Sequence, residues 1–571
     1  MTMDELEELN IKIQIANKFQ NEQEEKSKNY FPDFINLMND FRSIISILKD
    51  IYVRGYPKII QIEIKINNSK KHYEMNICDN EKENQKNNDE IRTNIINEKE
   101  QIKDVKYILS KLKTIRENLK KSQHEGYKKY EYIRYMFGRQ FNKLYNYLKQ
   151  LEQGKKEQNN EFITHFLNYI TNNKLEKTIS EYTWIRKEED EFQNIVFNIN
   201  EFIQKNLLIN NLSSKDVYSD SKLISGEYKG FYLYSCVDNL EKQLYQLYNY
   251  LTGKRPVAQN ILFCNVDTTK EEIESFLYRA ILCQYNSCFM IGGIELLEFG
   301  PKNYLIEFLN EIISEYGENM VSCLIVLSSD KTTDIHKSLD LIKCKKIFEE
   351  EISNKTKKCF LNNTDNIGIV KSDKAGVGKS EFIKKLKLNY LNRLYFPLGG
   401  SFSRDDLKNK GSEIDDPVDI FNRLRKMNIN NESLIHLDLY DSDDIDLITY
   451  FLFEFLILKS YKRNEEILML PNNIYIVIEI PNGFTDYESK FPILDLIPNN
   501  LRTSLSIKEL KPLKVFPKIN SNIQIVCNYL KLRRDNKLDT DDLIIPGVND
   551  DCFIEKKDEE KKVEEKKDDK I

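Results

Sequence analysis

The sequence IGIVKSDKAGVGKSEFIKKLKLNYL, residues 367 to 391, decides how the C-terminal half of the chain is interpreted. Its first part, Ile367 to Val370, is a short apolar run of the kind found in buried parallel strands. After a turn, apolar residues recur at helical spacing, namely Phe382, Ile383, Leu386 and Tyr390. The turn itself, Ser372 to Ser380, contains two glycines. A strand, a glycine-containing turn and a helix in direct succession predict a phosphate-binding loop.

Each residue type in this turn has a physical role in binding phosphate. Gly376 and Gly378 have no Cβ, so the backbone can approach an anion closely. Lys379 is expected to reach the β- and γ-phosphates of a nucleotide, and Ser380 to place its hydroxyl on Mg²⁺. We therefore predict ATP and Mg²⁺ as ligands. The predicted nucleotide-binding residues are Ala375, Gly376, Val377, Gly378, Lys379, Ser380 and Glu381.

One position departs from the pattern G-x-x-x-x-G-K-[ST], because Asp373 stands where the first glycine is usual. Asp tolerates left-handed backbone better than most residues, so the loop is still expected to close. A chance Gly-Lys-Ser sequence in a chain rich in Lys and Ser is the alternative. The position of the motif between an expected strand and an expected helix favours nucleotide binding over chance.

Composition limits the classes of protein to which the chain can belong. It has 571 residues, of which 40% are hydrophobic, enough for several packed domains. The charged fraction is 31%, but the net charge is only −6, so no nucleic-acid partner is predicted. The acidic N-terminus lacks the apolar core of a secretory signal, and no apolar stretch is long enough to predict a membrane span. These features predict a cytoplasmic location.

The N-terminal half is predicted to be mainly α-helical. Residues 1–66 show helical periodicity followed by one strict alternation, which predicts a helical hairpin and a strand. Residues 67–97 are rich in Asn and Lys and are predicted to be a disordered insertion. Residues 98–254 are predicted to be helical. They carry a stripe that we expect to be core, formed by Tyr127, Tyr130, Tyr135, Phe137, Phe141, Tyr145 and Leu148.

Strands and helices alternate in the rest of the chain, which predicts parallel sheets with helices on their faces. The first such unit, residues 255–345, contains no Gly-Lys-Ser/Thr and lacks a phosphate loop. The second unit, residues 355–535, carries the loop. Residues 550–571 are a charged run that is predicted to be disordered. The predicted fold class is therefore α/β, with P-loop units that contain parallel sheets, preceded by a mainly α-helical region.

A candidate magnesium ligand lies on the second strand after the loop strand, Ser433 to Tyr440. In P-loop proteins an acid on such a strand holds Mg²⁺, so Asp438 is the predicted partner of Ser380 in binding the ion. On the alternative interpretation, Asp438 is a strand-end acid that faces solvent. Active sites of this kind commonly have a second acid that orients water, but Leu439 follows Asp438 here. Glu479 ends the next strand.

Several long segments carry a resemblance to a known family. They are SDKAGVGKSEFIKKL (372–386), LIHLDLYDSDDIDLITYFLFEFLIL (434–458), IYIVIEIPN (474–482), RPVAQNILFCNVDTTKEEIESFLYRAILC (255–283) and YKKYEYIRYMFGRQFNKLYNYLKQL (127–151). These segments resemble the mysterin family, giant dynein-like AAA+ proteins that also act as E3 ubiquitin ligases. The resemblance implies that residues 255–345 form a degenerate AAA unit and that residues 355–535 form an AAA+ unit that binds ATP.

The function implied by this resemblance is that of an ATP-binding AAA+ module whose nucleotide is structural or regulatory, with slow or no hydrolysis. Position by position, Gly376, Gly378, Lys379 and Ser380 fall on the family's phosphate loop. The sequence shows no Cys/His zinc cluster, so ubiquitin transfer is not assigned to this chain. Other AAA or ligase domains or chains are the expected partners. An active AAA+ ATPase and an interaction scaffold with a vestigial P-loop are the two alternatives.

Overall fold

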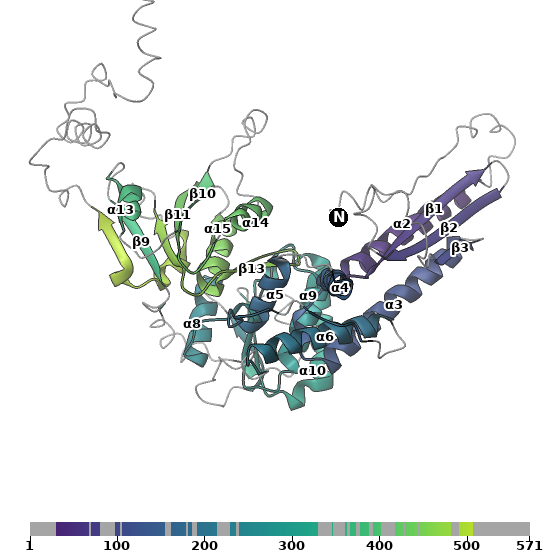
Figure 1. Cartoon of the computed structure of the whole chain (residues 1–571), viewed down its shortest axis with the longest axis horizontal. Coiled ribbons are helices and arrows are strands. Elements are labelled where there is room, and N and C mark those ends of the chain that lie inside the picture. The colour runs from purple at the N-terminus through teal and green to yellow at the C-terminus, as the bar shows by residue number, and fades with distance from the viewer. Residues whose placement is uncertain are drawn as a thin grey trace, which may run out of the picture.

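A computed structural model shows a helical region joined to an N-terminal antiparallel sheet and to two parallel sheets (Figure 1). The residues that it describes are 30–67, 70–79, 98–102, 105–154, 161–178, 181–185, 191–213, 229–235, 239–328, 345–346, 360–361, 366–372, 377–386, 392–400, 417–427, 429–442, 445–480 and 490–505. Within these ranges, no helix combines the length and the apolar character needed to cross a bilayer.

The N-terminal part forms a helix and an antiparallel sheet that projects from the rest of the molecule (Figure 1). Helix α2 (Tyr30–Val53) leads into β1 (Lys58–Asn67), which confirms the predicted strand. Strand β1 pairs with β2 (Lys70–Asp79), and β2 pairs with β3 (Glu98–Ile102). Strand β2 corrects the prediction that residues 67–97 are a disordered insertion, because it is paired along both of its edges.

The sequence of β2 carried a local signal for a strand. Tyr73, Met75 and Ile77 alternate with polar residues, but the surrounding Asn and Lys residues outweighed this pattern. The remainder of the predicted insertion, residues 80–97, lies outside the described residues. So do residues 1–29, which include the first half of the predicted helical hairpin, and the predicted charged tail, residues 550–571.

The helical region packs around the predicted aromatic stripe. Its elements are α3 (Val105–Lys129), η3 (Tyr132–Tyr135), α4 (Gln140–Glu152), α5 (Glu161–Thr171) and α6 (Glu191–Ile209). The stripe residues with buried side chains are Tyr127, Tyr135, Phe137, Phe141, Tyr145 and Leu148. Tyr130 is half-buried and packs against the same core. The prediction that this stripe is core is confirmed.

The first parallel sheet has the strand order β5-β6-β7-β4-β8. Its strands are β4 (Gly230–Ser235), β5 (Ile261–Phe263), β6 (Cys288–Gly292), β7 (Cys323–Ser328) and β8 (Lys345–Lys346). The helices along it are α8 (Leu240–Thr252), α9 (Lys270–Ile281) and α10 (Phe299–Tyr316), with short turns η4 (Ala258–Asn260), η5 (Ile294–Leu296) and η6 (Gly317–Asn319). All neighbouring strands run parallel.

Strand β4 corrects the predicted start of this unit. Residues 98–254 were predicted to be helical, but β4 pairs with β7 and β8 and is followed by α8. Its aromatic and apolar run, GFYLYS, suits a strand, and four of its side chains are buried. Helix α9 of this unit is capped by Thr269, whose hydroxyl accepts a hydrogen bond from the N–H of Glu272 at 3.2 Å.

The second parallel sheet has the strand order β10-β11-β14-β9-β15. Its strands are β9 (Ile367–Ser372), β10 (Asn392–Gly400), β11 (Ser433–Ser442), β14 (Tyr475–Glu479) and β15 (Arg502–Leu505). The helices and turns between them are α13 (Lys379–Lys385), α14 (Pro417–Lys426), α15 (Ile445–Leu452), η9 (Phe453–Leu458), η10 (Pro492–Leu496) and η11 (Asn499–Leu501). A hairpin of β12 (Ser460–Arg463) and β13 (Glu466–Met469) completes the unit.

Both parallel sheets have the same topology. Numbered along each unit, the strands lie in the order second, third, fourth, first, fifth in both cases. The units differ between their third and fourth strands. The first unit has α10 there, whereas the second has α15, the π-helix η9 and the β12–β13 hairpin. We call this segment of the second unit, residues 445–469, the docking insertion.

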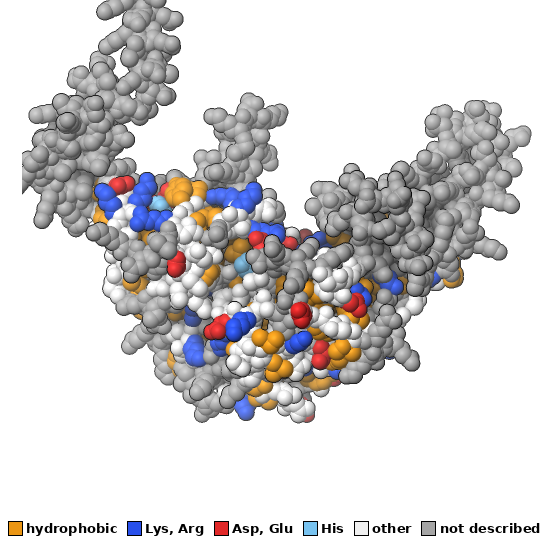
Figure 2. All heavy atoms as spheres, viewed as in Figure 1, with side chains coloured by type: hydrophobic (Ala, Val, Ile, Leu, Met, Phe, Trp, Pro, Cys, Tyr) orange, Lys and Arg blue, Asp and Glu red, His pale blue; other side chains and the backbone are white. Residues whose placement is uncertain are grey.

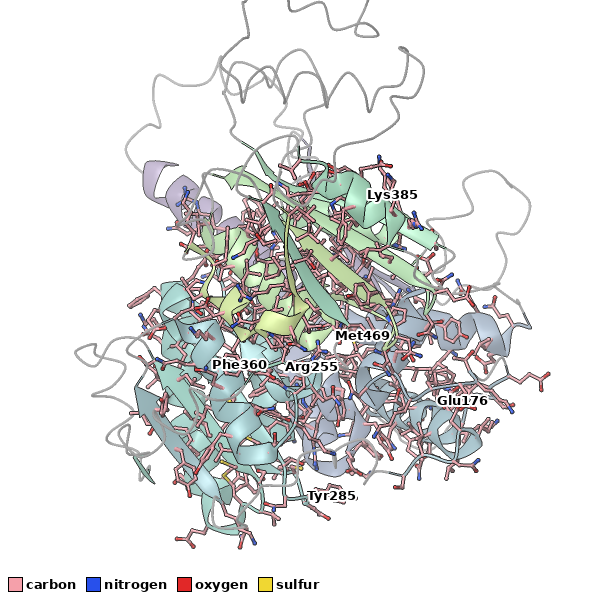
Figure 3. All side chains as sticks on the ribbon, turned by 90° about the vertical axis from the view of Figure 1, so that its left-hand side faces the viewer. Glu176, Arg255, Tyr285, Phe360, Lys385 and Met469 are labelled. Atoms are coloured by element: carbon pink, nitrogen blue, oxygen red, sulfur yellow. The ribbon has the colours of Figure 1, made fainter. Side chains whose placement is uncertain are left out.

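The docking insertion packs against the first parallel unit. The guanidinium group of Arg255 donates hydrogen bonds to the backbone carbonyls of Leu456 and Ile457 in η9. The ring of Phe263 lies 5.5 Å from that of Tyr450 and 5.2 Å from that of Phe453, measured between centroids. Arg255 and Met469, labelled in Figure 3, lie where the two units meet.

The helical region holds the same insertion from another side. Arg139 binds the carboxylate of Glu465 through two nitrogens, at 3.1 and 2.6 Å. Lys143 Nζ lies 2.5 Å from Glu466 Oε1. The docking insertion is therefore clamped between the helical region and the first parallel unit.

Candidate functional site

Strand β9 and helix α13 carry the described part of the predicted phosphate loop. Ile367, Ile369 and Val370 of β9 are buried, as predicted for the loop strand. Gly378 has a φ of +90°, a left-handed conformation that residues with a Cβ rarely adopt, and α13 begins at the next residue. Residues 373–376, which include the predicted ligands Ala375 and Gly376, lie outside the described residues.

The other predicted loop residues differ in their surroundings. Val377 is buried. Glu381 is exposed and forms an ion pair with Lys385 one turn later, with 3.5 Å between Oε1 and Nζ. Lys379 is buried, with 7% of its surface exposed, and Ser380 is half-buried. The side chains of these last two residues are therefore the ones that extend toward the sheet.

Lys379 and Ser380 converge on one carboxylate, that of Glu479. The Ser380 hydroxyl donates a hydrogen bond to Glu479 Oε2 at 2.8 Å. Lys379 Nζ lies 3.8 Å from Glu479 Oε1. His436 Nε2 lies 2.9 Å from Glu479 Oε2, so three side chains surround this buried acid.

The register of the sheet explains why these groups meet. Strand β14 lies between β9 and β11, with Glu479 paired with Val370 on one side and with Asp438 on the other. Paired residues on parallel strands point to the same face of a sheet, and residues i and i+2 of one strand do too. Asp438, Glu479 and His436 therefore share one face. Their ligand atoms all lie within 4.8 Å of one another.

The electrostatics of the site favour an ionised acid. Burial alone would raise the pKa of Glu479, but the hydrogen bonds from His436 and Ser380 and the nearby charge of Lys379 outweigh it and lower that pKa. Burial also lowers the pKa of Lys379, although the negative charges of Glu479 and Asp438 oppose this change. Glu479 is consequently an anion at neutral pH.

Asp438, the predicted magnesium ligand, lies beside Glu479 rather than at an isolated strand end. Its Oδ2 accepts a hydrogen bond from the hydroxyl of Tyr395 on β10 at 2.7 Å. Oxygen donors from Ser380, Asp438 and Glu479 fit Mg²⁺, which prefers carboxylate, hydroxyl and phosphate oxygens. When bound, Mg²⁺ would neutralise phosphate charge.

Two members of the cluster, His436 and Glu479, were not among the predicted site residues. The spacing of His436 and Asp438, two apart on a predicted strand, was a local signal that they share a face. No such signal exists for Glu479, because its place depends on β14 lying between β9 and β11. Leu439, where a second acid was sought, is buried among apolar side chains.

Exposed basic side chains lie on helices α13 and α14 and at the start of β10. Figure 2 shows Lys and Arg side chains over the part of the surface where Figure 1 places α13, β10 and α14. The exposed basic residues of these elements include Lys384 and Lys385 in the last turn of α13, Arg393 on β10, and Arg425 and Lys426 in the last turn of α14. Arg393 is paired with Leu434, four residues before Asp438, so this basic surface lies toward the opposite end of the strands from Glu479.

The equivalent place in the first parallel unit is filled by its own side chains. Helix α8, which follows the first strand there, has its N-terminus capped by Asn239, whose side chain accepts a hydrogen bond from the N–H of Lys242 at 2.9 Å. Leu240 and Leu244 of this helix pack on the end of β6, where a Cβ added to Gly292 would lie 3.7 and 3.3 Å from their methyl groups. This unit offers an apolar surface where the second unit offers Lys379 and Ser380.

Comparisons with known proteins give the chain no relative. A scan against models of known protein families finds no match, and a search of curated proteins finds no similar sequence. Arguments about function therefore rest on the residues and geometry of the site.

Proposed function

We propose that the second parallel unit binds ATP together with Mg²⁺. One observation carries the proposal, namely that Lys379 and Ser380 of the G-K-S sequence converge on Glu479 with Asp438 beside it. A lysine, a hydroxyl and carboxylates in one place supply a phosphate contact and a magnesium site. In a nucleotide complex, Lys379 would exchange Glu479 for phosphate oxygens, and Ser380 and Asp438 would hold the metal.

The topology supports a ligand at this position. In open α/β sheets, ligands bind outside the carboxyl ends of the strands, at the point where the strand order reverses. Strand β9, with neighbours β14 and β15, stands at that point. One strand, β14, separates β9 from β11, the strand that carries Asp438.

We propose further that the nucleotide is a structural or regulatory ligand, as in a module of a mysterin-like E3 ubiquitin ligase. The docking insertion supports this role, because it connects β11, which carries Asp438, directly with β14, which carries Glu479. A ligand that binds Asp438 and Glu479 would therefore constrain both ends of the docking insertion, which packs on the first unit. The mysterin resemblance itself rests on the sequence segments alone, and no ubiquitin-transfer chemistry is proposed for this chain.

An active ATPase is the second candidate, and the position of Glu479 favours it. This carboxylate lies beside Asp438 on the same face, so it could orient a water molecule even though Leu439 cannot. Phosphate release under saturating ATP and Mg²⁺ separates the two candidates. Turnover well below about 1 s⁻¹, the low end of ordinary enzyme rates, supports a structural or regulatory nucleotide. Faster turnover that is lost in Glu479→Gln would establish the ATPase instead.

Lys379→Ala tests the proposal as a whole. We expect the unmutated chain to bind ATP and to gain thermal stability, by about 2.7 kcal/mol at a ligand concentration one hundred times Kd. Lys379→Ala should abolish both effects, as measured by titration calorimetry and by melting curves with and without ATP. Lys384→Ala, an exposed lysine on the same helix, is the matched control and should bind ATP almost normally. If both variants respond equally to ATP, or if the unmutated chain does not respond at all, the proposal is rejected. The remaining interpretation would be an interaction scaffold with a vestigial loop.

A further inference from the structure

A cluster of one imidazole and two carboxylates lies beside the proposed nucleotide site. We infer that His436, Asp438 and Glu479 bind a divalent transition-metal ion of the Mn²⁺ class, and that they do so without nucleotide. One ligand atom from each residue lies within 4.8 Å of the other two. That separation allows a single ion to contact all three after small side-chain adjustments, since metal bonds to nitrogen and oxygen are about 2.0–2.2 Å long.

The backbone fixes these residues in place. His436 and Asp438 are two apart on β11, and Glu479 is paired with Asp438 across the parallel ladder to β14. These are internal strands of the sheet, with neighbours on both sides. The residues His436 and Glu479 are only 6% and 7% exposed, so their side chains have little freedom to move. A rigid arrangement of donors lowers the entropic cost of holding an ion.

The donor types favour a transition metal over Mg²⁺. Magnesium in proteins is bound mainly by oxygen, and it keeps several of its water molecules. Imidazole nitrogen suits first-row transition metals, while carboxylates suit Mn²⁺ as well as Mg²⁺. A mixed set of one nitrogen and two carboxylates therefore selects an ion that accepts both kinds of donor. The hydroxyl of Ser380, 2.8 Å from Glu479 Oε2, is close enough to serve as a fourth ligand.

The charges of the cluster also favour a bound cation. Asp438 and Glu479 place two carboxylates side by side, and Lys379 Nζ lies 3.8 Å from Glu479 Oε1. A second His–Glu pair in the chain differs in this respect. His124 Nε2 lies 3.2 Å from Glu274, but two guanidinium nitrogens of Arg54 contact the same carboxylate at 3.1 and 3.2 Å. That arginine compensates the charge and repels a metal ion.

Electron paramagnetic resonance of Mn²⁺ with the nucleotide-free full chain tests the inference without any mutation. We expect about one equivalent of Mn²⁺ to bind, and a tenfold excess of Mg²⁺ to leave most of it in place. The bound ion should show coupling to one imidazole nitrogen, which changes when the chain is labelled with ¹⁵N-histidine. Absence of binding, or binding without nitrogen coupling, overturns the inference.

Substitutions then locate the site. His436→Ala should weaken Mn²⁺ binding by about tenfold or more, and Glu479→Gln should weaken it similarly while keeping the shape of the side chain. His124→Gln, in the matched His–Glu pair, should bind Mn²⁺ as the unmutated chain does. Equal Mn²⁺ affinities in His436→Ala and His124→Gln would contradict the assignment.

The inference and the proposed function can fail separately. Lys379→Ala removes the lysine expected to hold phosphate, so it should lose ATP binding. The same variant should keep Mn²⁺, or bind it more tightly, because a neighbouring positive charge is gone. A chain that binds Mn²⁺ through nitrogen but never ATP upholds the metal site and removes the proposed function. A chain that binds ATP but shows no nitrogen-coupled Mn²⁺ upholds the proposed function and removes the metal site.

Discussion

The two parallel units have the same strand order but present different side chains at the same place in the fold. In the second unit, Val370 lies two residues before the end of the first strand. It is paired with Glu479 on β14, which is paired in turn with Asp438 on β11. In the first unit the corresponding register is Leu233, Val326 and Ile291, which are all buried and apolar. One topology therefore carries a polar cluster in one copy and a packed core in the other. Topology alone does not specify a site, because function lies in the side chains placed on it.

The turns that precede the equivalent helices differ in the same way. Helix α8 of the first unit is capped by Asn239, while α13 of the second begins after Gly378, which leaves room around its Cα. In the first unit, a left-handed glycine, Gly293, follows the third strand and packs tightly against the chain. The first unit uses this end of its sheet for packing, whereas the proposed function has the second unit bind a ligand there.

Replacing these two glycines gives the largest expected contrast. An alanine Cβ at Gly293, where φ is +73°, would lie 2.6 Å from the backbone carbonyl oxygen of Cys264. Gly293→Ala should therefore cost about 4 kcal/mol or more of unfolding free energy, from strain and steric conflict together. At Gly378 a Cβ would meet no atom of the described residues within 4 Å, so Gly378→Ala should cost only about 1–2 kcal/mol. Melting curves followed by circular dichroism measure both.

The contrast extends to ligand binding. Gly378→Ala should weaken ATP binding through the altered turn, and Gly293→Ala should leave the affinity of the folded fraction unchanged. If the two variants melt at the same temperature, the first unit is not more tightly packed at this end than the second. The comparison between the units would then be wrong.

The free energy of unfolding should depend on pH because of Glu454 in the docking insertion. Burial raises the pKa of this carboxyl from 4.5 to about 7, although Lys462 N–H and the Tyr450 hydroxyl donate hydrogen bonds to it. The folded state thus holds the proton more tightly than the unfolded state. Stability from this group is greatest below about pH 4.5 and falls as the pH rises to about 7.

Glu454→Gln should remove this fall, because the amide stays neutral. Relative to the unmutated chain, the variant should gain up to about 3 kcal/mol between pH 5 and pH 8, at about 1.4 kcal/mol per pKa unit. Melting temperatures across this range measure the gain. Glu466→Gln is the control on the same insertion, since the pKa of Glu466 is lowered, chiefly by its hydrogen bond with Lys143 against the effect of burial. A gain that does not vary with pH would show that Glu454 is ionised throughout.

Local sequence patterns predicted most elements of the two parallel sheets, but not which strands are neighbours. The loop strand and the strand of Asp438 followed from short-range patterns. Strand β4 was missed because it lies between long helical patterns, although its aromatic run after Gly230 was a signal. Prediction of β2 failed because composition was weighted above alternation.

The site was predicted to the extent that its residues are close in sequence. Lys379 and Ser380 belong to one motif, and Asp438 follows from counting strands. Glu479 joins them only because β14 is inserted between β9 and β11, a long-range pairing that no window of sequence contains. The pairing of strands in the sheet therefore adds Glu479 to a candidate site of which the sequence motif specifies only a part.

Arg255→Ala tests whether the docking insertion couples the two units. The arginine donates to the carbonyls of Leu456 and Ile457, and a hydrogen bond from a charged donor contributes about 1.5–3 kcal/mol. Because Arg255 is only half-buried, we expect a loss of about 2 kcal/mol in melting experiments. Arg255→Lys should lose less, since one ammonium can reach one carbonyl. Hydrogen exchange should also quicken in η9 but not in β9. Unchanged exchange in η9 would mean that the two units are held together without this contact.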